Sequence, residues 1–235
     1  MTTGLATVWN CETSSSRTRA QHSGGCLLGT GESSTHPLQR LLPLFTFPDA
    51  SYAKTVGSML EDVGITHVEV TFRNTQAPAA IEAIRSNTGL TVVAGTVTTE
   101  SFADEAQKAG AHFAVAPHVD ENLIAYASSR GLELVPGIAT PTEAFRARQA
   151  GARRLKVFPA KSLGGPGFLR ALAAVSPEVS FLPSGGVGVE DLEQYLALPF
   201  VELVGGSWIT APESIADYES LRKEISALVQ AVSAR

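Results

Sequence analysis

The sequence predicts an α/β fold made of repeated strand–helix units, and three observations lead to this prediction. From Leu38 onward, short runs rich in Val, Ile and Leu alternate with segments of helical periodicity. The same junction of a helix end, a glycine and a strand recurs at three places in the chain. No second zone of distinct composition follows, so we assign residues 37–235 to one domain.

Eight segments have the composition of β-strands. They lie at residues 41–47, 66–72, 91–95, 112–116, 132–136, 153–158, 179–182 and 201–205. Good helix formers with helical periodicity lie between them, for example in 81–85, 101–110 and 219–232. Strand–helix units of this number within roughly 200 residues match the lower end of the size range of a (β/α)8 barrel. The predicted fold class is therefore α/β, a single (β/α)8 TIM barrel.

The first 36 residues differ from the rest of the chain. Half of them are Ser, Thr or Gly, and only four are charged. We expect residues 1–36 to form a disordered N-terminal extension. Both cysteines, Cys11 and Cys26, lie in this segment, so the sequence offers neither a disulfide framework nor a zinc site, and we expect a cytoplasmic location.

The composition excludes several classes of function. Apolar runs such as 134–139 fall far short of the roughly 18–20 residues that a membrane-spanning helix needs. The formal net charge is −5 and the Lys and Arg residues are dispersed, so the sequence has no basic stripe for nucleic acid or for anionic lipid. We expect a small-molecule ligand, with no nucleic acid and no membrane.

The three repeated junctions lie at 61–70, 107–116 and 148–157. Each contains a glycine that suits the left-handed cap of a helix. These glycines are Gly64, Gly110 and Gly151. The fifth residue after each of them is Glu69, Val115 or Lys156. If the junctions are equivalent, these side chains occupy matching positions on alternate strands and contribute to one interior layer of the barrel.

Strand alternation also predicts that Lys156 and Glu69 point inward. Leu155 and Val157 share the opposite face of their strand, where an apolar pair packs under the helices. An unpaired charge in the interior is costly. Two interpretations therefore stand: Lys156 and Glu69 form a structural ion pair, or Lys156 is a Schiff-base lysine, since a desolvated amine that loses its proton can attack a ketone. Lys161, in the following loop, is a weaker candidate for the nucleophile.

Two glycine-rich loops follow the last two predicted strands. Ser184, Gly185 and Gly186 follow the seventh strand, and Gly205, Gly206 and Ser207 follow the eighth. Loops at these positions commonly bind phosphate in such barrels, because glycine exposes backbone N–H groups to an oxyanion. The alternative is that both are tight turns.

Six motifs resemble those of the 2-keto-3-deoxy-6-phosphogluconate (KDPG) aldolases and their 4-hydroxy-2-oxoglutarate (KHG) aldolase relatives. They are VEVTFR (68–73), AGTV (94–97), APH (116–118), LKVFPA (155–160), PSGG (183–186) and GGSW (205–208). The resemblance covers nearly all of residues 38–232 and keeps the order and spacing of the motifs.

This resemblance implies a class I aldolase that uses no metal and no cofactor other than a covalent imine on Lys156. Lys156 matches the Schiff-base lysine that reacts with the carbonyl of pyruvate, and Glu69 matches the general acid/base. Arg73 and Thr96 match positions that hold the substrate carboxylate, and Phe158 matches the aromatic residue beside the imine.

The same resemblance implies cleavage of 2-dehydro-3-deoxy-6-phosphogluconate to pyruvate and glyceraldehyde 3-phosphate in the Entner–Doudoroff pathway of carbohydrate metabolism, and a homotrimer. KHG is a further candidate substrate. Three residues depart from the family pattern: Lys161 stands where Glu is frequent, Ser184 where Thr is frequent, and Thr46 where some relatives have Arg. These departures leave the aldehyde half of the substrate open. The alternatives are a phosphate-binding isomerase or epimerase and a non-catalytic ligand-binding barrel.

Overall fold

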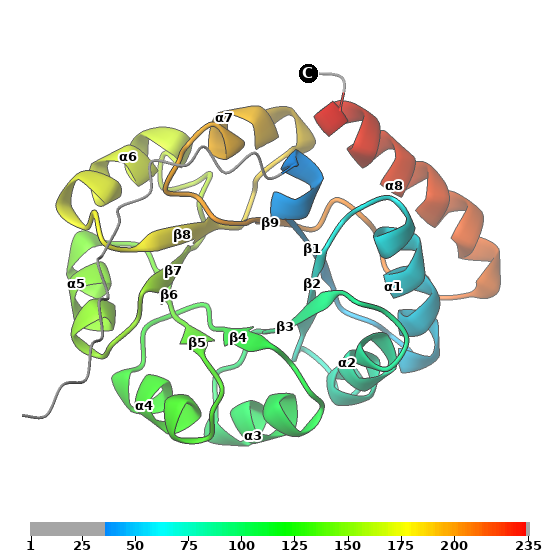
Figure 1. Ribbon diagram of the computed structural model, residues 1–235, viewed down its shortest axis with the longest axis horizontal. Coiled ribbons are helices and arrows are strands. Elements are labelled where there is room, and N and C mark those ends of the chain that lie inside the picture. The colour runs from blue at the N-terminus through cyan, green and yellow to red at the C-terminus, as the bar shows by residue number, and fades with distance from the viewer. Residues whose placement is uncertain (1–35, 234–235) are drawn as a thin grey trace, which may run out of the picture. The chain divides into compact units, whose positions relative to one another are not determined.

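The computed structural model describes residues 36–233 of the chain, and Figure 1 shows how their helices and strands are arranged. These described residues belong to one compact unit. The predicted disordered extension, residues 1–36, lies outside the described residues except for His36, and both cysteines lie outside them as well. Within the described part of the chain, none of the helices is long and apolar enough to cross a bilayer.

The strands alternate with helices along the chain. The strands are β1 (Leu41–Phe45), β2 (His67–Thr71), β3 (Thr91–Gly95), β4 (Phe113–Val115), β5 (Leu134–Val135), β6 (Gly137–Ile138), β7 (Arg154–Val157), β8 (Ser180–Pro183) and β9 (Val204–Gly206). The α-helices are α1 (Ala53–Asp62), α2 (Ala77–Arg85), α3 (Glu100–Lys108), α4 (Glu121–Ser129), α5 (Pro141–Gln149), α6 (Gly165–Val175), α7 (Leu192–Leu196) and α8 (Tyr218–Ser233). Short 3-10 helices are η1 (Pro37–Arg40), η2 (Ala50–Tyr52), η3 (Val189–Asp191) and η4 (Ile215–Asp217).

All the strand pairs are parallel, and they form two sheets. One sheet has six strands in the order β5-β4-β3-β2-β1-β9, and the other has three in the order β6-β7-β8. In Figure 1 the strands surround a common centre and the helices lie outside them. Isolated parallel bridges, Phe181 to Val201 and Ser184 to Gly205, connect β8 to the segment that contains β9.

The predicted α/β class and the strand–helix alternation are confirmed, whereas the single continuous sheet of eight strands is not seen. The fifth predicted strand, 132–136, contains β5, whereas β6 lies just beyond it on the other side of Pro136. β5 pairs with β4, and β6 pairs with β7. Proline has no N–H to donate to a ladder. Pro136 still accepts a hydrogen bond at its carbonyl from the Lys156 amide, at 2.9 Å.

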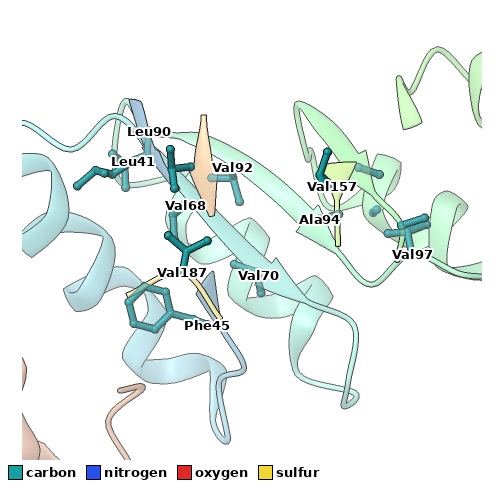
Figure 2. Packing of buried hydrophobic residues seen from close by; sticks show 14 of the residues in the cluster. Leu41, Phe45, Val68, Val70, Leu90, Val92, Ala94, Val97, Val157 and Val187 are labelled. Atoms are coloured by element: carbon teal, nitrogen blue, oxygen red, sulfur yellow. The ribbon is translucent and has the colours of Figure 1, made fainter. Parts of the chain in front are cut away.

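Buried apolar side chains form two clusters, one on each side of the strands. The larger cluster lies between strands and helices, and Figure 2 shows part of it, including Val68, Val70, Val92 and Ala94. The smaller one, called here the inner cluster, consists of Leu42, Val93, Phe113, Val115, Val135, Leu182 and Leu203. Neighbouring residues of one strand, such as Val92 and Val93, belong to different clusters, as the period of two along a strand requires.

The three repeated junctions have the predicted helix caps. Gly64, Gly110 and Gly151 have φ values of 86°, 85° and 98°, which are accessible at little cost only to glycine. The side chains five residues further along are all buried: Glu69, Val115 and Lys156. The spacing of the repeats therefore predicts correctly which residues point away from solvent.

The amino ends of the strands carry a polar cluster. Arg154 donates to Glu133 at 2.7 Å and to Glu202 at 3.0 Å, and its guanidinium lies 4.0 Å from the centroid of the Phe113 ring. His67 lies at the start of β2, and its Nδ1 is 2.9 Å from the Thr66 hydroxyl. These groups close the end of the sheets opposite the carboxyl ends of the strands.

We predict that His67 makes the protein less stable in mild acid. Burial lowers the pKa of His67 from its ordinary value of 6.5, and the nearby charges of Arg154 and His112 lower it further, although the Gln39 backbone and Glu202 act in the opposite direction. As the pH falls through this ordinary value, the unfolded chain binds the proton before the folded chain does, so stability falls. His67→Gln should lose less free energy of unfolding than the wild type between about pH 7.5 and about pH 5.5, measured by urea denaturation. Parallel pH profiles would contradict the prediction.

Candidate active site

Lys156 and Glu69 form a buried ion pair at the centre of the fold. The Lys156 Nζ lies 3.3 Å from Glu69 Oε1 and 3.5 Å from Oε2, and the two side chains are 8% and 1% exposed. Lys156 comes from β7 and Glu69 from β2, which belong to different sheets. The pair therefore joins the two sheets across the interior.

Each residue of this pair has an apolar neighbour on an adjacent strand. The residue next to Glu69 on β3 is Val93, and the residue next to Lys156 on β8 is Leu182. Both belong to the inner cluster. Within residues 36–233, the two Glu69 oxygens are the acceptors of the Lys156 amine. An ammonium has three donors, so this amine retains capacity to interact with a bound molecule.

Gly95 provides the space that Glu69 occupies. A Cβ atom at Gly95 would overlap the Glu69 carboxyl group and would lie 2.7 Å from its Cγ. The Gly95 carbonyl also accepts a hydrogen bond from the Phe72 amide at 2.7 Å. The glycine at the end of β3 thus fixes how the Glu69 side chain lies, a role that motif reading alone does not assign to it.

Thr96 and Arg73, the predicted carboxylate-binding residues, lie just beyond the ends of β3 and β2. Thr96 is half-buried and has a φ of 60°, which no other non-glycine residue described in the chain shares. A positive φ is strained for a β-branched residue, and such strain is concentrated at functional sites. Arg73 is exposed, and its side chain makes no hydrogen bond or ion pair with another described residue. Both groups are therefore accessible to a ligand at this end of the sheets.

Phe158 connects the ion pair to the first glycine-rich loop. The Lys156 Nζ lies 5.9 Å from the centroid of the half-buried Phe158 ring. A Cβ atom at Gly185 would lie 2.9 Å from that ring. Gly185 also has a φ of 92°, so both space and backbone conformation require glycine there. The ring lies between the amine and this loop.

The two predicted phosphate-binding loops lie side by side. Ser184 is buried at the end of β8 and is bridged to Gly205. A Cβ atom at Gly205 would lie 3.0 Å from the Ser184 hydroxyl oxygen. Gly206 is buried, whereas Ser207 and Gly186 are exposed. Gly186 has a φ of 76° and makes no hydrogen bond with another described residue, so its N–H faces solvent.

Two contacts near the site are not evident from the sequence. The hydroxyls of Thr46 and Thr71 lie 2.6 Å apart. The register that pairs Leu44 with Glu69 extends to this pair, so the correct strand alignment would have indicated it. Lys161, the weaker nucleophile candidate, is exposed and lies 2.8 Å from Asp191. This hydrogen bond raises the pKa of Lys161.

Residues 36–233 contain no group of three or more His, Cys, Asp or Glu side chains that could hold a metal ion. What the site offers is a buried amine beside one carboxylate, an exposed guanidinium, and glycine loops with accessible N–H groups. These groups suit covalent chemistry on a carbonyl compound that carries anionic ends.

A sequence profile described as "Aldolase: KDPG and KHG aldolase" matches residues 34–225. The chain belongs to the KDPG and KHG aldolase family. It is 39% identical over 178 residues to the 2-dehydro-3-deoxy-phosphogluconate aldolase of Treponema pallidum, which covers 75% of this chain and 85% of that protein. The resemblance seen in the six sequence motifs is therefore confirmed.

Solved structures of the KDPG and KHG aldolase family share the fold. The KDPG aldolase of Zymomonas mobilis, solved with 3-phosphoglycerate, is 32% identical with a TM-score of 0.74, over 84% of this chain and 93% of that one. The KDPG aldolase of Legionella pneumophila, with pyruvate captured as a covalent carbinolamine, is 33% identical with a TM-score of 0.74, over 84% of this chain and 98% of that one.

We predict that Gly95→Ala destabilises the fold by about 1–3 kcal/mol, because the added methyl group displaces the buried Glu69 carboxylate or the backbone of β3. Urea denaturation would measure the loss. Gly167→Ala in α6 is the matched control, since its Cβ position has open space around it and the change should stabilise by up to about 1 kcal/mol. A Gly95 variant as stable as wild type would show that Glu69 can move without cost.

Proposed function

We propose that this chain is a class I aldolase that cleaves 2-dehydro-3-deoxy-6-phosphogluconate to pyruvate and glyceraldehyde 3-phosphate. The observation that carries the proposal is the buried Lys156 amine, 3.3 Å from a single carboxylate and with an apolar neighbour on an adjacent strand. Membership of the KDPG and KHG aldolase family supports it, as does the covalent carbinolamine of pyruvate in the Legionella relative. No cofactor is needed beyond the imine on Lys156.

The first half of the reaction forms an imine. The neutral Lys156 Nζ attacks C2 of the substrate, and the carbonyl oxygen takes up a proton to give a carbinolamine. Loss of water then leaves a protonated imine. Glu69 lies within hydrogen-bond distance of Nζ, so its carboxyl group can accept a proton from the amine and deliver one to the departing hydroxyl.

The second half breaks the bond between C3 and C4. Glu69 accepts the proton of the C4 hydroxyl, C4 becomes the aldehyde carbon, and the electron pair of the broken bond moves toward the iminium to form an enamine. The iminium serves as the electron sink, so no bare carbanion forms. Proton transfer to C3 and hydrolysis by one water release pyruvate and return the free Lys156 amine.

The remaining residues suit the two anionic ends of this substrate. Arg73 and Thr96 would hold the carboxylate at C1, with Phe158 against the imine. The phosphate would lie on the two loops Ser184–Gly186 and Gly205–Ser207, whose N–H groups and serine hydroxyls suit an oxyanion. KHG has a second carboxylate, bonded directly to C4, in place of the more distant phosphate, so it would use the same C1 carboxylate site without reaching the two loops.

We also infer the molecular setting of the reaction. The bridges between β8 and the β9 segment support closure of the two sheets into a (β/α)8 barrel, with the site at the carboxyl ends of its strands. A cytoplasmic homotrimer acting in the Entner–Doudoroff pathway agrees with family membership. Gel filtration with light scattering would measure the subunit number.

We predict that borohydride reduction in the presence of pyruvate traps a single adduct on Lys156. Intact-protein mass and peptide mapping would detect it. Lys156→Ala should give no adduct, whereas Lys161→Ala, the matched control, should give the wild-type adduct. Absence of any adduct would favour a phosphate-binding isomerase or epimerase, or a non-catalytic ligand-binding barrel. An adduct on Lys161 would show that Lys161, and not Lys156, is the nucleophile.

We predict that Glu69→Gln lowers kcat by roughly a hundred- to ten-thousandfold, as expected when a general acid/base is removed. The amide keeps the shape of the side chain but does not exchange protons in the required range. Steady-state kinetics on the phosphorylated substrate would measure this change, and circular dichroism would verify that the variant is folded. A rate within twofold or so of wild type would remove Glu69 from the proton transfers.

A further inference from the structure

Lys161 belongs to the loop that follows β7, and this loop is bound to the one that follows β8. The Ala160 amide donates to the Ser184 carbonyl at 2.8 Å, and the Lys161 amide donates to the Gly185 carbonyl at 3.1 Å. These two bonds fix the near end of the segment 184–191, called here the phosphate loop, which contains the proposed phosphate-binding glycines.

The Lys161 stem lies over the middle of the phosphate loop. A Cβ atom at Gly186 would lie 3.1 Å from the Lys161 Cβ and 3.7 Å from its Cδ. The methylene groups of Lys161 therefore pack directly on the Gly186 backbone, whose φ of 76° already requires glycine. A longer side chain at position 186 would displace the lysine.

The Lys161 ammonium reaches the far end of the phosphate loop. It lies 2.8 Å from Asp191 Oδ2 and 3.5 Å from Glu190 Oε1. The same Asp191 oxygen accepts the Gly188 amide at 3.1 Å. The hydrogen bond from Lys161, followed by the one from the Gly188 amide, lowers the pKa of Asp191, so the carboxylate stays ionised and the contact persists at neutral pH.

The charges of this cluster argue against a direct role in binding phosphate. One ammonium faces two carboxylates, so the group Lys161, Glu190 and Asp191 is anionic as a whole when all three are ionised. Such a group does not attract an oxyanion. The Gly186 amide, by contrast, has no partner among the described residues, and successive backbone N–H groups in a turn can form an anion-binding concavity.

We propose that Lys161 is a positioning residue for the phosphate end of the substrate: its side chain spans the phosphate loop from Gly186 to Asp191 and holds the glycine amides in place. This inference rests on the proposed function, since it assigns a role within the same site. It predicts that Lys161 sets the preference for a phosphorylated substrate over KHG, without contact with either one.

The test compares Lys161→Met, Asp191→Asn and the double variant on both substrates. Lys161→Met keeps the apolar stem and removes the charge. Each single variant should raise KM for the phosphorylated substrate about two- to fivefold, the size expected of a partly exposed ion pair, with kcat nearly unchanged. KM for KHG should not change. The double variant should raise KM for the phosphorylated substrate no more than either single variant does, because both substitutions remove the same interaction between Lys161 and Asp191.

Each other result would overturn the proposal in a recognisable way. A lower KM for Asp191→Asn would mean that Lys161 binds phosphate directly once it is released from its carboxylate. An equal rise in KM for both substrates would indicate general damage to the fold. An unchanged KM for both would show that Lys161 is a surface side chain with no positioning role. Lys223→Met is the matched control, because it removes an exposed pair with Glu219 at 3.5 Å in α8; all constants should stay at wild-type values.

Binding of inorganic phosphate, measured by calorimetry, separates this inference from the proposed function. If the wild type cleaves neither substrate but binds phosphate, and Lys161→Met weakens that binding by the same factor, the aldolase proposal fails and the positioning role stands. If phosphate does not bind, or if Lys161→Met binds it as the wild type does, the positioning role fails.

Discussion

The buried pair of Lys156 and Glu69 is the constraint on which the rest of this structure depends. Taking two charges out of water costs several kcal/mol per ion, and the neighbours of the pair on adjacent strands include Val93 and Leu182 of the inner cluster. The cost is offset only if the two groups are held close together. The two partners come from β7 and β2, which belong to different sheets. The two sheets must therefore be positioned so that the Lys156 amine and the Glu69 carboxylate lie within hydrogen-bond distance of each other.

Glycines meet this requirement where side chains would interfere. Gly95 leaves room for the Glu69 carboxyl group beside β3, and a Cβ at Gly137 would overlap the backbone of Pro117. Gly137 begins β6, immediately after the proline that ends β5. Gly137 also pairs with Lys156, where β6 joins β7. The close approach of the backbone at Gly137 is therefore next to the strand that holds the lysine. Thr96, the one described non-glycine residue with a positive φ, follows Gly95 directly, and strain of this kind is concentrated at functional sites.

Much of this arrangement could be predicted from the sequence, because it follows from local rules. The period of two along a strand and the left-handed glycines five residues upstream put Glu69 and Lys156 on the buried face. Long-range register could not be derived in the same way. Three features depend on contacts between segments that are separated in the chain. They are the pairing of β6 with β7 after Pro136, the contact between the Thr46 and Thr71 hydroxyls, and the pairing of Lys161 with Asp191. Composition does not encode which residues of such segments meet.

The two ends of the proposed site are held by different means. Glu69 and Lys156 lie on strands beside residues of the inner cluster, so a change near them disturbs the core. Lys161, Ser184 and Thr46 lie beyond the ends of β7, β8 and β1, and they are the positions at which the resemblance leads us to expect departures from the family pattern. We therefore expect chemistry at the proposed pyruvate end to depend on the fold itself, whereas selection at the proposed aldehyde end depends on loops that can vary without disrupting the fold.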